Sequence, residues 1–342
     1  MKLFKWIIVF CFLLNSATAF AQYSNTSWYF HDSRIDFQNQ PASLKKSNVG
    51  TSGCHQFVIT NCNGDVKIIA YSRGRIYNGN EQVMKGSDKL GADELYYLID
   101  GFIYPGSKDS IVIFHDFFAS GKAYWGYSIV DLTKDSGRGE VIKSKVIVRN
   151  RLNPTMTVVK HANNIDYWIL GTSDSFSAFA YHFSNKGLNP TTVLSSGVFN
   201  DYLLKNVTYD FNNLWACLAP FVPTWDSKQI IVTGLTKWRH ATACALIYDF
   251  DNSTGKITNP QELFKRSNLN TKTEYTTQKA AIAPNDTFIY LGVVHPNSVG
   301  TLGSNDFACF YQLNRYTKTK VLLKTQFVNT YNIRFSWNQR NT

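Results

Sequence analysis

The most informative stretch of the sequence is Tyr248-Asp249-Phe250-Asp251-Asn252-Ser253-Thr254-Gly255-Lys256-Ile257, where an apolar strand end runs into a polar turn and a new strand. Three further strand ends have this form and also lead into polar turns: Tyr127-Ser128-Ile129-Val130-Asp131-Leu132, Tyr181-His182-Phe183 and Tyr311-Gln312-Leu313. They follow one another at intervals of roughly 50 to 70 residues, the scale of one sheet in a repeating β-structure. The sequence therefore contains an internal repeat.

Strand signals continue on both sides of these segments. Short apolar runs bounded by Gly, Asn, Asp, Pro and Ser recur, and we find no helical periodicity of useful length. The composition, with 15% aromatic and 17% charged residues, is typical of half-buried strands joined by polar turns. A four-stranded sheet cannot bury both of its faces alone. We therefore predict an all-β fold, a β-propeller of about 5–7 four-stranded antiparallel blades.

Two segments predict hairpins at the inner side of a blade. In residues 282–290, the turn Pro284-Asn285-Asp286 separates two apolar strands. Residues 331–340 look like the start of the same hairpin, so we expect the sequence to stop inside a blade. Three arrangements fit this expectation: a smaller ring, a ring closed by strands from Trp28 to Phe37, and an open ring.

The N-terminus predicts export. Lys2 and Lys5 precede the apolar run Trp6 to Leu14, and Ala19-Phe20-Ala21 fits a signal peptidase site. We predict a signal peptide over residues 1–21 and the propeller over residues 22–342. No later stretch has 18 consecutive apolar residues, so we expect no transmembrane segment and a periplasmic, cell-surface or extracellular location.

Charge and cysteine content add weaker constraints. The formal net charge is +11, but the basic residues are scattered and form no nucleic-acid-binding arm, so we expect no nucleic acid partner. Cys54 and Cys62 flank a turn and either form a disulfide or stay reduced. Three further cysteines lie in apolar runs that favour buried thiols: Cys217, Cys244 and Cys309.

Several of these segments resemble a known family. They include Trp28-Tyr29-Phe30, Gly53-Cys54 with Asn63-Gly64, Ile76-Tyr77-Asn78, Gln82-Val83-Met84, Val159-Lys160-His161-Ala162-Asn163-Asn164-Ile165-Asp166-Tyr167-Trp168 and the opening stretch. Residues 26–342 are similar to the WD-like, propeller-like N-terminal region of exported Bacteroidetes proteins, many of which carry a gliding-motility or type IX secretion sorting domain. The resemblance implies seven or so blades and cell-surface display. The sorting domain is not found here, and too few repeats follow residue 331 to complete that number.

Two groups of residues are candidates for a binding site. His115 and Asp116 follow an apolar run, at a strand end of the kind where propellers place ligand groups. His161, Asp166 and Trp168 lie in the most specific of the segments above. For His161 and Asp166 we favour a structural role in a hairpin, because Asn and Asp side chains commonly bond backbone amides in turns.

Signatures of the common enzyme classes are missing from the sequence. We find no H-E-x-x-H, G-x-S-x-G, C-x-x-C or Walker-type motif and expect no cofactor and no metal site. Asp249, Asp251 and Ser253 mimic part of a calcium loop, but Thr254 and Pro260 occupy positions that need Gly and Glu.

The sequence therefore favours a binding or interaction module without catalytic residues, with an envelope or extracellular protein or glycan as its partner. The alternative is a carbohydrate-binding or carbohydrate-active propeller of the glycosidase or lyase type, since such enzymes gather carboxylates from different blades. Trp125, Trp225 and Trp238 would then stack on sugar rings. A purely structural surface component is the third hypothesis.

Overall fold

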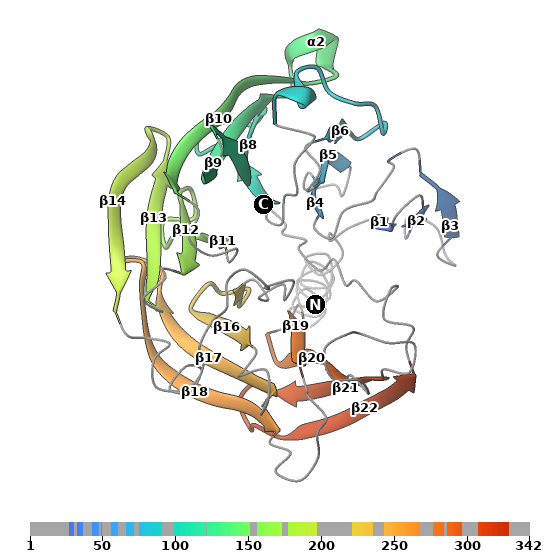
Figure 1. Cartoon of the computed structure of the whole chain (residues 1–342), viewed down its shortest axis with the longest axis vertical. Helices are drawn as coiled ribbons and strands as arrows, with labels where there is room; N and C mark the ends of the chain where they lie inside the picture. The colour runs from blue at the N-terminus through green and yellow to red at the C-terminus, as the bar shows by residue number, and fades with distance from the viewer. Residues whose placement is uncertain are drawn as a thin grey trace, which may run out of the picture.

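The computed structural model describes most of the β-structure of the chain. The described residues are 27–30, 33–36, 43–47, 49, 56–60, 66–71, 75–90, 99–120, 122–150, 156–172, 177–196, 221–234, 243–266, 276–283, 286–295 and 307–327. They form six antiparallel sheets arranged around a common centre (Figure 1). None of their helices has the length and apolar character needed to span a bilayer.

We number the sheets as blades 1 to 6 in chain order. Blade 1 contains β1 (Ser27–Phe30), β2 (Ser33–Asp36) and β3 (Ser43–Lys46), and blade 2 contains β4 (Gln56–Thr60), β5 (Val66–Tyr71) and β6 (Ile76–Asn78). Blade 3 contains β7 (Ile99–Ile103), β8 (Ser110–Ala119), β9 (Lys122–Asp131) and β10 (Glu140–Asn150). Blade 4 contains β11 (Met156–Lys160), β12 (Tyr167–Thr172), β13 (Ala178–Ser184) and β14 (Gly187–Ser195).

Blade 5 contains β15 (Val222–Pro223), β16 (Gln229–Gly234), β17 (Ala243–Asp251) and β18 (Lys256–Arg266). Blade 6 contains β19 (Thr276–Ile282), β20 (Phe288–His295), β21 (Phe307–Asn314) and β22 (Lys320–Phe327). Two short helical turns are also described, η1 (Ser87–Leu90) and α2 (Lys134–Gly137).

Each blade is an up-and-down meander whose strands pair with their sequence neighbours. In blade 2 an isolated antiparallel bridge between Tyr77 and Val83 supplies a fourth element after β6, which gives five blades of four strands. The predicted all-β propeller of four-stranded antiparallel blades is therefore confirmed. The N-terminal strands near Trp28 form a sheet of their own, blade 1, which Figure 1 shows between blade 2 and blade 6.

The cores of the molecule lie between successive blades. Along β16 the side chains alternate, so that Ile230 packs with residues of blade 4 whereas Ile231 packs with residues of blade 6. The strand period of two thus gives blade 5 two apolar faces, and each face is buried by a different neighbour. Equivalent cores join blades 2 and 3 and blades 3 and 4, and Val49, which follows β3, packs against blade 2.

The repeat predicted from the sequence corresponds to one position in the blade. The four strand ends are the ends of β9, β13, β17 and β21, and the polar turns that follow lead from the third to the fourth strand. In these turns Asp131, Ser184, Asp251 and Asn314 each accept a bond from the amide two residues on. Small polar side chains recur there because they satisfy the turn backbone.

The first and the third turn of each blade lie at one edge of the ring. In a meander, the turns from first to second strand and from third to fourth strand lie at the same edge, which we call the turn rim. The hairpin predicted over residues 282–290 is confirmed as β19 and β20, with Pro284 and Asn285 outside the described residues. Its turn places an amide-to-carbonyl bond between Asp286 and Ala283, and blades 4 and 5 have the same bond.

At the turn rim, blades 3 to 6 are linked to one another by their turns. The third turn of a blade reaches the first turn of the preceding blade: the Tyr104 hydroxyl donates to the Asn185 carbonyl at 3.2 Å, linking blades 3 and 4. The Ala162 amide donates to the Asn252 carbonyl at 3.0 Å, linking blades 4 and 5. Arg315 follows β21 as Asn185 follows β13 and Asn252 follows β17, and it links blades 5 and 6.

Some sequence predictions fall on residues that the structure does not describe. These are the signal peptide, residues 331–340, the pair Cys54 and Cys62, and Cys217. Cys244 and Cys309 lie in β17 and β21, as the apolar runs predicted, but their side chains are outside the described part of the chain.

Candidate functional site

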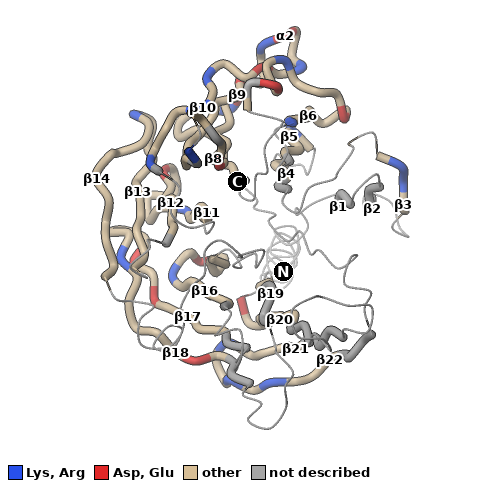
Figure 2. The backbone as a smooth tube through the Cα atoms, viewed as in Figure 1, with Lys and Arg blue, Asp and Glu red and all other residues tan. Residues whose placement is uncertain are grey.

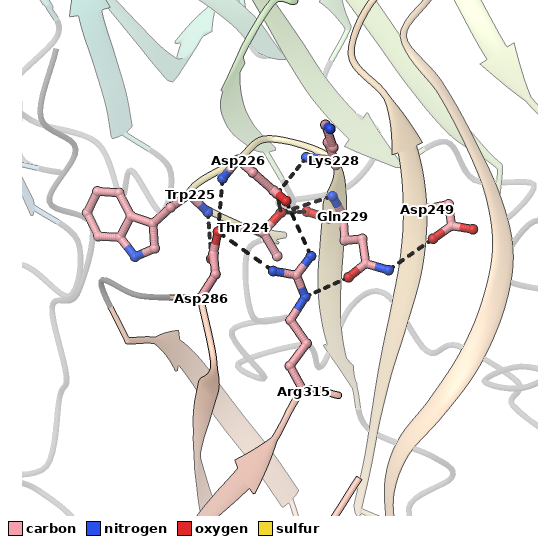
Figure 3. A network of polar contacts seen from close by, with 8 residues as sticks. All are labelled: Thr224, Trp225, Asp226, Lys228, Gln229, Asp249, Asp286 and Arg315. Atoms are coloured by element: carbon pink, nitrogen blue, oxygen red, sulfur yellow. Dashed lines mark hydrogen bonds and ion pairs between the residues drawn. The ribbon is translucent and has the colours of Figure 1, made fainter. Parts of the chain in front are cut away.

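An arginine of blade 6 enters the turn rim of blade 5 (Figure 3). The Arg315 side chain is 7% exposed, and its Nε donates to Gln229 Oε1 at 2.7 Å. Its Nη2 lies 3.6 Å from Asp226 Oδ2, and its Nη1 lies 3.6 Å from Asp286 Oδ2. A nearly buried guanidinium is thus held between two carboxylates that belong to neighbouring blades, which fixes its orientation.

Asp286 connects the same two blades through the backbone. It has a left-handed conformation with φ 57°, which Asp tolerates better than most residues. Its Oδ1 accepts from the Trp225 amide at 2.9 Å, and its Oδ2 accepts from the Asp226 amide at 3.0 Å. The carboxylate of blade 6 therefore holds the backbone of the turn that carries Trp225.

Asp226 is held by its own turn and keeps an open side. It accepts from the Thr224 hydroxyl at 2.6 Å and from the Lys228 amide at 3.0 Å, yet its side chain is 42% exposed. Burial raises the pKa of Asp226, but the bonds from Thr224 and Lys228, together with Arg315, outweigh it and the net pKa lies below the usual value. Asp226 is therefore an ionised acceptor with room for another donor.

The polar row continues to Asp249 on β17. Gln229 Nε2 donates to Asp249 Oδ1 at 3.0 Å, and Asn259 Nδ2 donates to Asp249 Oδ2 at 3.0 Å. These two bonds lower the pKa of Asp249. Lys318 faces the row as well, and its pKa is lowered by burial and by the nearby Arg315. The row from Asp286 to Asn259 thus crosses the boundary between blades 5 and 6.

Two exposed aromatic side chains accompany this row. Trp225 is 44% exposed and Tyr316 is 66% exposed. The guanidinium of Arg315 lies 5.5 Å from the centre of the Tyr316 ring, within range of a cation–π contact. In Figure 3 the Trp225 ring points away from Arg315 on the far side of Asp286. Aromatic rings and fixed charges are therefore presented together at this part of the turn rim.

The other two tryptophans singled out from the sequence do not belong to this surface. Stacking of Trp125 on a sugar ring, as the carbohydrate-binding alternative expected, is wrong: Trp125 is buried between blades 3 and 4, with its ring 5.3 Å from that of Phe179. The alternation along β9 directs it into the core, which the sequence does not reveal for a strand with apolar residues on both faces. Trp238 lies outside the described residues.

The predicted residues His161, Asp166 and Trp168 come together in blade 4. The His161 amide donates to the Asp166 carbonyl at 2.9 Å, which closes the turn between β11 and β12. Inside the turn, Asn163 Oδ1 accepts from the amides of Ile165 and Asp166 at 3.0 and 2.9 Å. The preferred structural role in a hairpin is confirmed by these contacts, whereas ligand binding by these residues stays a prediction.

A histidine that the site prediction did not include completes this cluster. His182 Nε2 lies 3.1 Å from Asp166 Oδ2, and its ring centre is 5.0 Å from that of His161 and 5.1 Å from that of Trp168. Trp168 is buried and donates from Nε1 to the Asn252 carbonyl of blade 5 at 2.9 Å. The cluster therefore supports the contact between blades 4 and 5.

His115 and Asp116 lie inside β8 and do not follow it. They were predicted to follow a strand, which is wrong, since β8 continues to Ala119 and both side chains are buried. His115 Nε2 lies 2.9 Å from Ser128 Oγ, and Nδ1 lies 3.3 Å from the Asp116 carbonyl. Burial lowers the pKa of His115 to about 4, so the imidazole is neutral at pH 7. The prediction ended the strand at its first polar residues. A strand can nevertheless continue through buried polar residues when their side chains are hydrogen-bonded.

The residues that mimic a calcium loop have other partners. Asp251 Oδ1 accepts from the Ser253 hydroxyl at 2.6 Å, and Oδ2 accepts from the Thr254 hydroxyl at 2.6 Å. Together with bonds from turn amides, these contacts lower the pKa of Asp251 to about 2. Among the described residues, no group of three or more His, Cys, Asp or Glu side chains has the geometry of a metal site.

The comparisons with known proteins add no family. No protein-family model matches the sequence, and no curated protein is similar to it. Solved structures with a similar fold include the periplasmic gluconolactonase of Pseudomonas aeruginosa, at 8% identity and TM-score 0.49, covering 90% of this chain and 82% of that one.

Two further structures are a putative 6-phosphogluconolactonase from Bacteroides uniformis, at 13% identity and TM-score 0.46, covering 86% of this chain and 78% of that one, and the Nup133 β-propeller domain of Vanderwaltozyma polyspora, at 10% identity and TM-score 0.42, covering 89% of this chain and 83% of that one. At this level of similarity, neither activity nor ligand follows from them. The class that the chain's own sheets define is the β-propeller.

Proposed function

We propose that this protein is an exported carbohydrate-binding propeller and that its ligand lies on the turn rim of blades 5 and 6. The observation that carries the proposal is the exposure of Trp225 and Tyr316 beside the fixed charges of Asp226 and Arg315. Most other aromatic side chains of the described residues are buried between sheets, and Tyr290 is 40% exposed.

The chemistry of this surface fits a sugar. A pyranose ring has an apolar C–H face, which a flat aromatic ring covers, and hydroxyl groups, which charged acceptors and donors bond strongly. Trp225 and Tyr316 offer the aromatic surfaces, and Asp226 offers an ionised acceptor that is partly open to solvent. Because Asp286 holds the backbone of the turn, little backbone order has to be gained there on binding.

The same surface favours binding over glycoside hydrolysis. Hydrolysis by a carboxylate pair needs one carboxyl group with a raised pKa to protonate the leaving oxygen. The pKa values of Asp226 and Asp249 are lowered instead. Both groups therefore accept hydrogen bonds at neutral pH and donate no proton.

Export is part of the proposal and rests on the sequence. The basic and apolar segments before Gln22 support cleavage after Ala21. The resemblance to exported Bacteroidetes propellers points the same way, and membership of the gliding-motility or type IX secretion group stays a prediction. Mass spectrometry of the protein secreted or released from the envelope should give Gln22 as the first residue. Retention of residues 1–21 would contradict export by this route.

Affinity electrophoresis tests the ligand class. The protein is run on native gels that contain a soluble β-glucan, a mannan or a polygalacturonate, and we expect retardation by at least one of them. Trp225→Ala and Tyr316→Ala should each weaken the retardation about tenfold or more, because a stacking partner is lost. Ile165→Ala is the matched control, since Ile165 is 56% exposed in the equivalent turn of blade 4.

Two results would overturn the proposal. One is migration of the wild-type protein that none of the three polysaccharides changes. The other is retardation that Trp225→Ala and Tyr316→Ala leave at the wild-type level, which would move the site elsewhere on the ring.

A further inference from the structure

The outer strand of blade 6 has one unpaired edge among the described strands. β22 pairs with β21 on one side and is the last strand in the order of its sheet. Figure 1 shows it at the outside of the ring. An edge strand presents backbone donors and acceptors in a row, and proteins usually protect such a row against pairing with other chains.

The outer strands of the neighbouring blades carry this protection. β10 has three register shifts and a left-handed Lys145. β14 contains Pro190, and β18 contains Pro260 next to a left-handed Asn259. Proline removes an edge donor, and bulges bend a strand out of line with an incoming one.

β22 has fewer of these features and is apolar at its start. It contains no proline, and its pairing with β21 shifts register at a single point, at Leu323. Val321, Leu322 and Leu323 are 55%, 51% and 50% exposed, three consecutive apolar residues in one edge strand. A row of this kind is suited to pairing with a further strand.

We propose that β22 is a docking strand for an extended, acidic segment of a partner protein, which adds a fifth strand to blade 6. Charge complementarity identifies the partner. Lys320 and Lys324 flank the apolar residues in the sequence. Acidic residues at both ends of an apolar strand match this pattern, and the backbone bonds of the added strand supply affinity.

A second copy of this chain fits the same strand poorly. Antiparallel pairing of two β22 strands centred on Leu322 overlays the apolar residues. It also puts Lys320 of each copy directly opposite Lys324 of the other. Like charges directly opposite each other destabilise a strand pair. The pattern therefore selects a partner of opposite charge.

A peptide-binding experiment tests this proposal independently of the sugar site. The probe is a fluorescent peptide of alternating Val and Thr residues with Asp and Glu at both ends. Its control has Lys at every acidic position. We expect the acidic peptide to bind the wild-type protein and Leu322→Glu to weaken binding about tenfold, since an apolar contact is replaced by a like charge.

Leu194→Glu is the matched control variant. Leu194 is 54% exposed, against 51% for Leu322, and lies in β14, the outer strand that contains Pro190. It should bind the acidic peptide like the wild type, and so should Trp225→Ala, which alters only the proposed sugar site. Slower amide hydrogen exchange in residues 320–323 on peptide addition would support the proposal directly.

Each of three outcomes would overturn it: no binding of the acidic peptide, equal binding of the acidic and basic peptides, or equal loss of binding in Leu322→Glu and Leu194→Glu. Concentration-dependent dimerisation that Leu322→Glu abolishes would also reject it, in favour of a second copy as the occupant.

Discussion

At the scale of single residues, a glycine marks a close contact between one turn and the neighbouring blade. Gly255 lies in the turn between β17 and β18 with φ +78°, and a Cβ on it would lie 2.8 Å from Cζ3 of Trp168. Glycine is therefore required at this position for two reasons: the backbone is left-handed, and the indole of Trp168 leaves no room for a side chain. Trp168, predicted as a binding residue, is in this respect a packing residue.

We predict that Gly255→Ala destabilises the protein more than Gly187→Ala. Gly187 occupies the equivalent turn of blade 4 with φ +90°, and nothing lies within 4 Å of its added Cβ. Its substitution measures the backbone strain alone, and the additional loss in Gly255→Ala should be about 1–3 kcal/mol from overpacking against Trp168. Urea unfolding of both variants gives the difference. Equal losses would show that the Trp168 contact contributes nothing.

A buried histidine should make the stability depend on pH. The pKa of His115 is about 4 in the folded protein, against about 6.5 for a histidine exposed to water, so the unfolded chain takes up the proton first as the pH falls. Stability is therefore lost between about pH 6.5 and pH 4. His115→Gln keeps a polar partner for Ser128 but does not titrate, and its unfolding free energy should fall less across this interval. The same acid response in both proteins would contradict this.

At the scale of strands and turns, the sequence predicted the repeated unit but not the links between units. The four strand ends and the inner hairpin of blade 6 were found because each is a local pattern of apolar strand and polar turn. Arg315, Asp226 and Asp286 were missed because their contacts join residues that are far apart in the sequence, such as the 86 positions between Arg315 and Gln229. An alignment of the turns that follow β9, β13, β17 and β21 could have singled out Arg315, because blades 4 and 5 have Asn185 and Asn252 at its position.

We predict that Arg315→Ala loosens the junction of blades 5 and 6. The substitution leaves Asp226 and Asp286 without their shared cation and should cost about 1–3 kcal/mol, discounted because Asp226 is partly solvated. Arg315→Lys should recover less than half of this, because one ammonium cannot reproduce the fork that meets both carboxylates. Chemical unfolding measures both losses, and full recovery by lysine would show that the charge alone matters.

At the scale of the whole molecule, the architecture follows from sheets with two apolar faces. Alternating residues such as Ile230 and Ile231 bury themselves against different neighbours, and this forces the blades to follow one another around a centre (Figure 1). The six sheets lie within the number predicted from the repeat, and the N-terminal strands form blade 1, which no local pattern had predicted as a separate sheet. Figure 2 shows Lys and Arg spread over several blades, in keeping with the scattered basic residues of the sequence.

Hydrogen–deuterium exchange of the protein, with and without the polysaccharide that retards it most, locates the binding site on the ring. The account predicts slower exchange in residues 221–234 and 314–320, which carry Trp225, Asp226, Arg315 and Tyr316, and unchanged exchange in residues 160–167 of blade 4. Protection confined to other blades, or none at all with saturating ligand, would contradict the assignment of the binding site to the turn rim of blades 5 and 6.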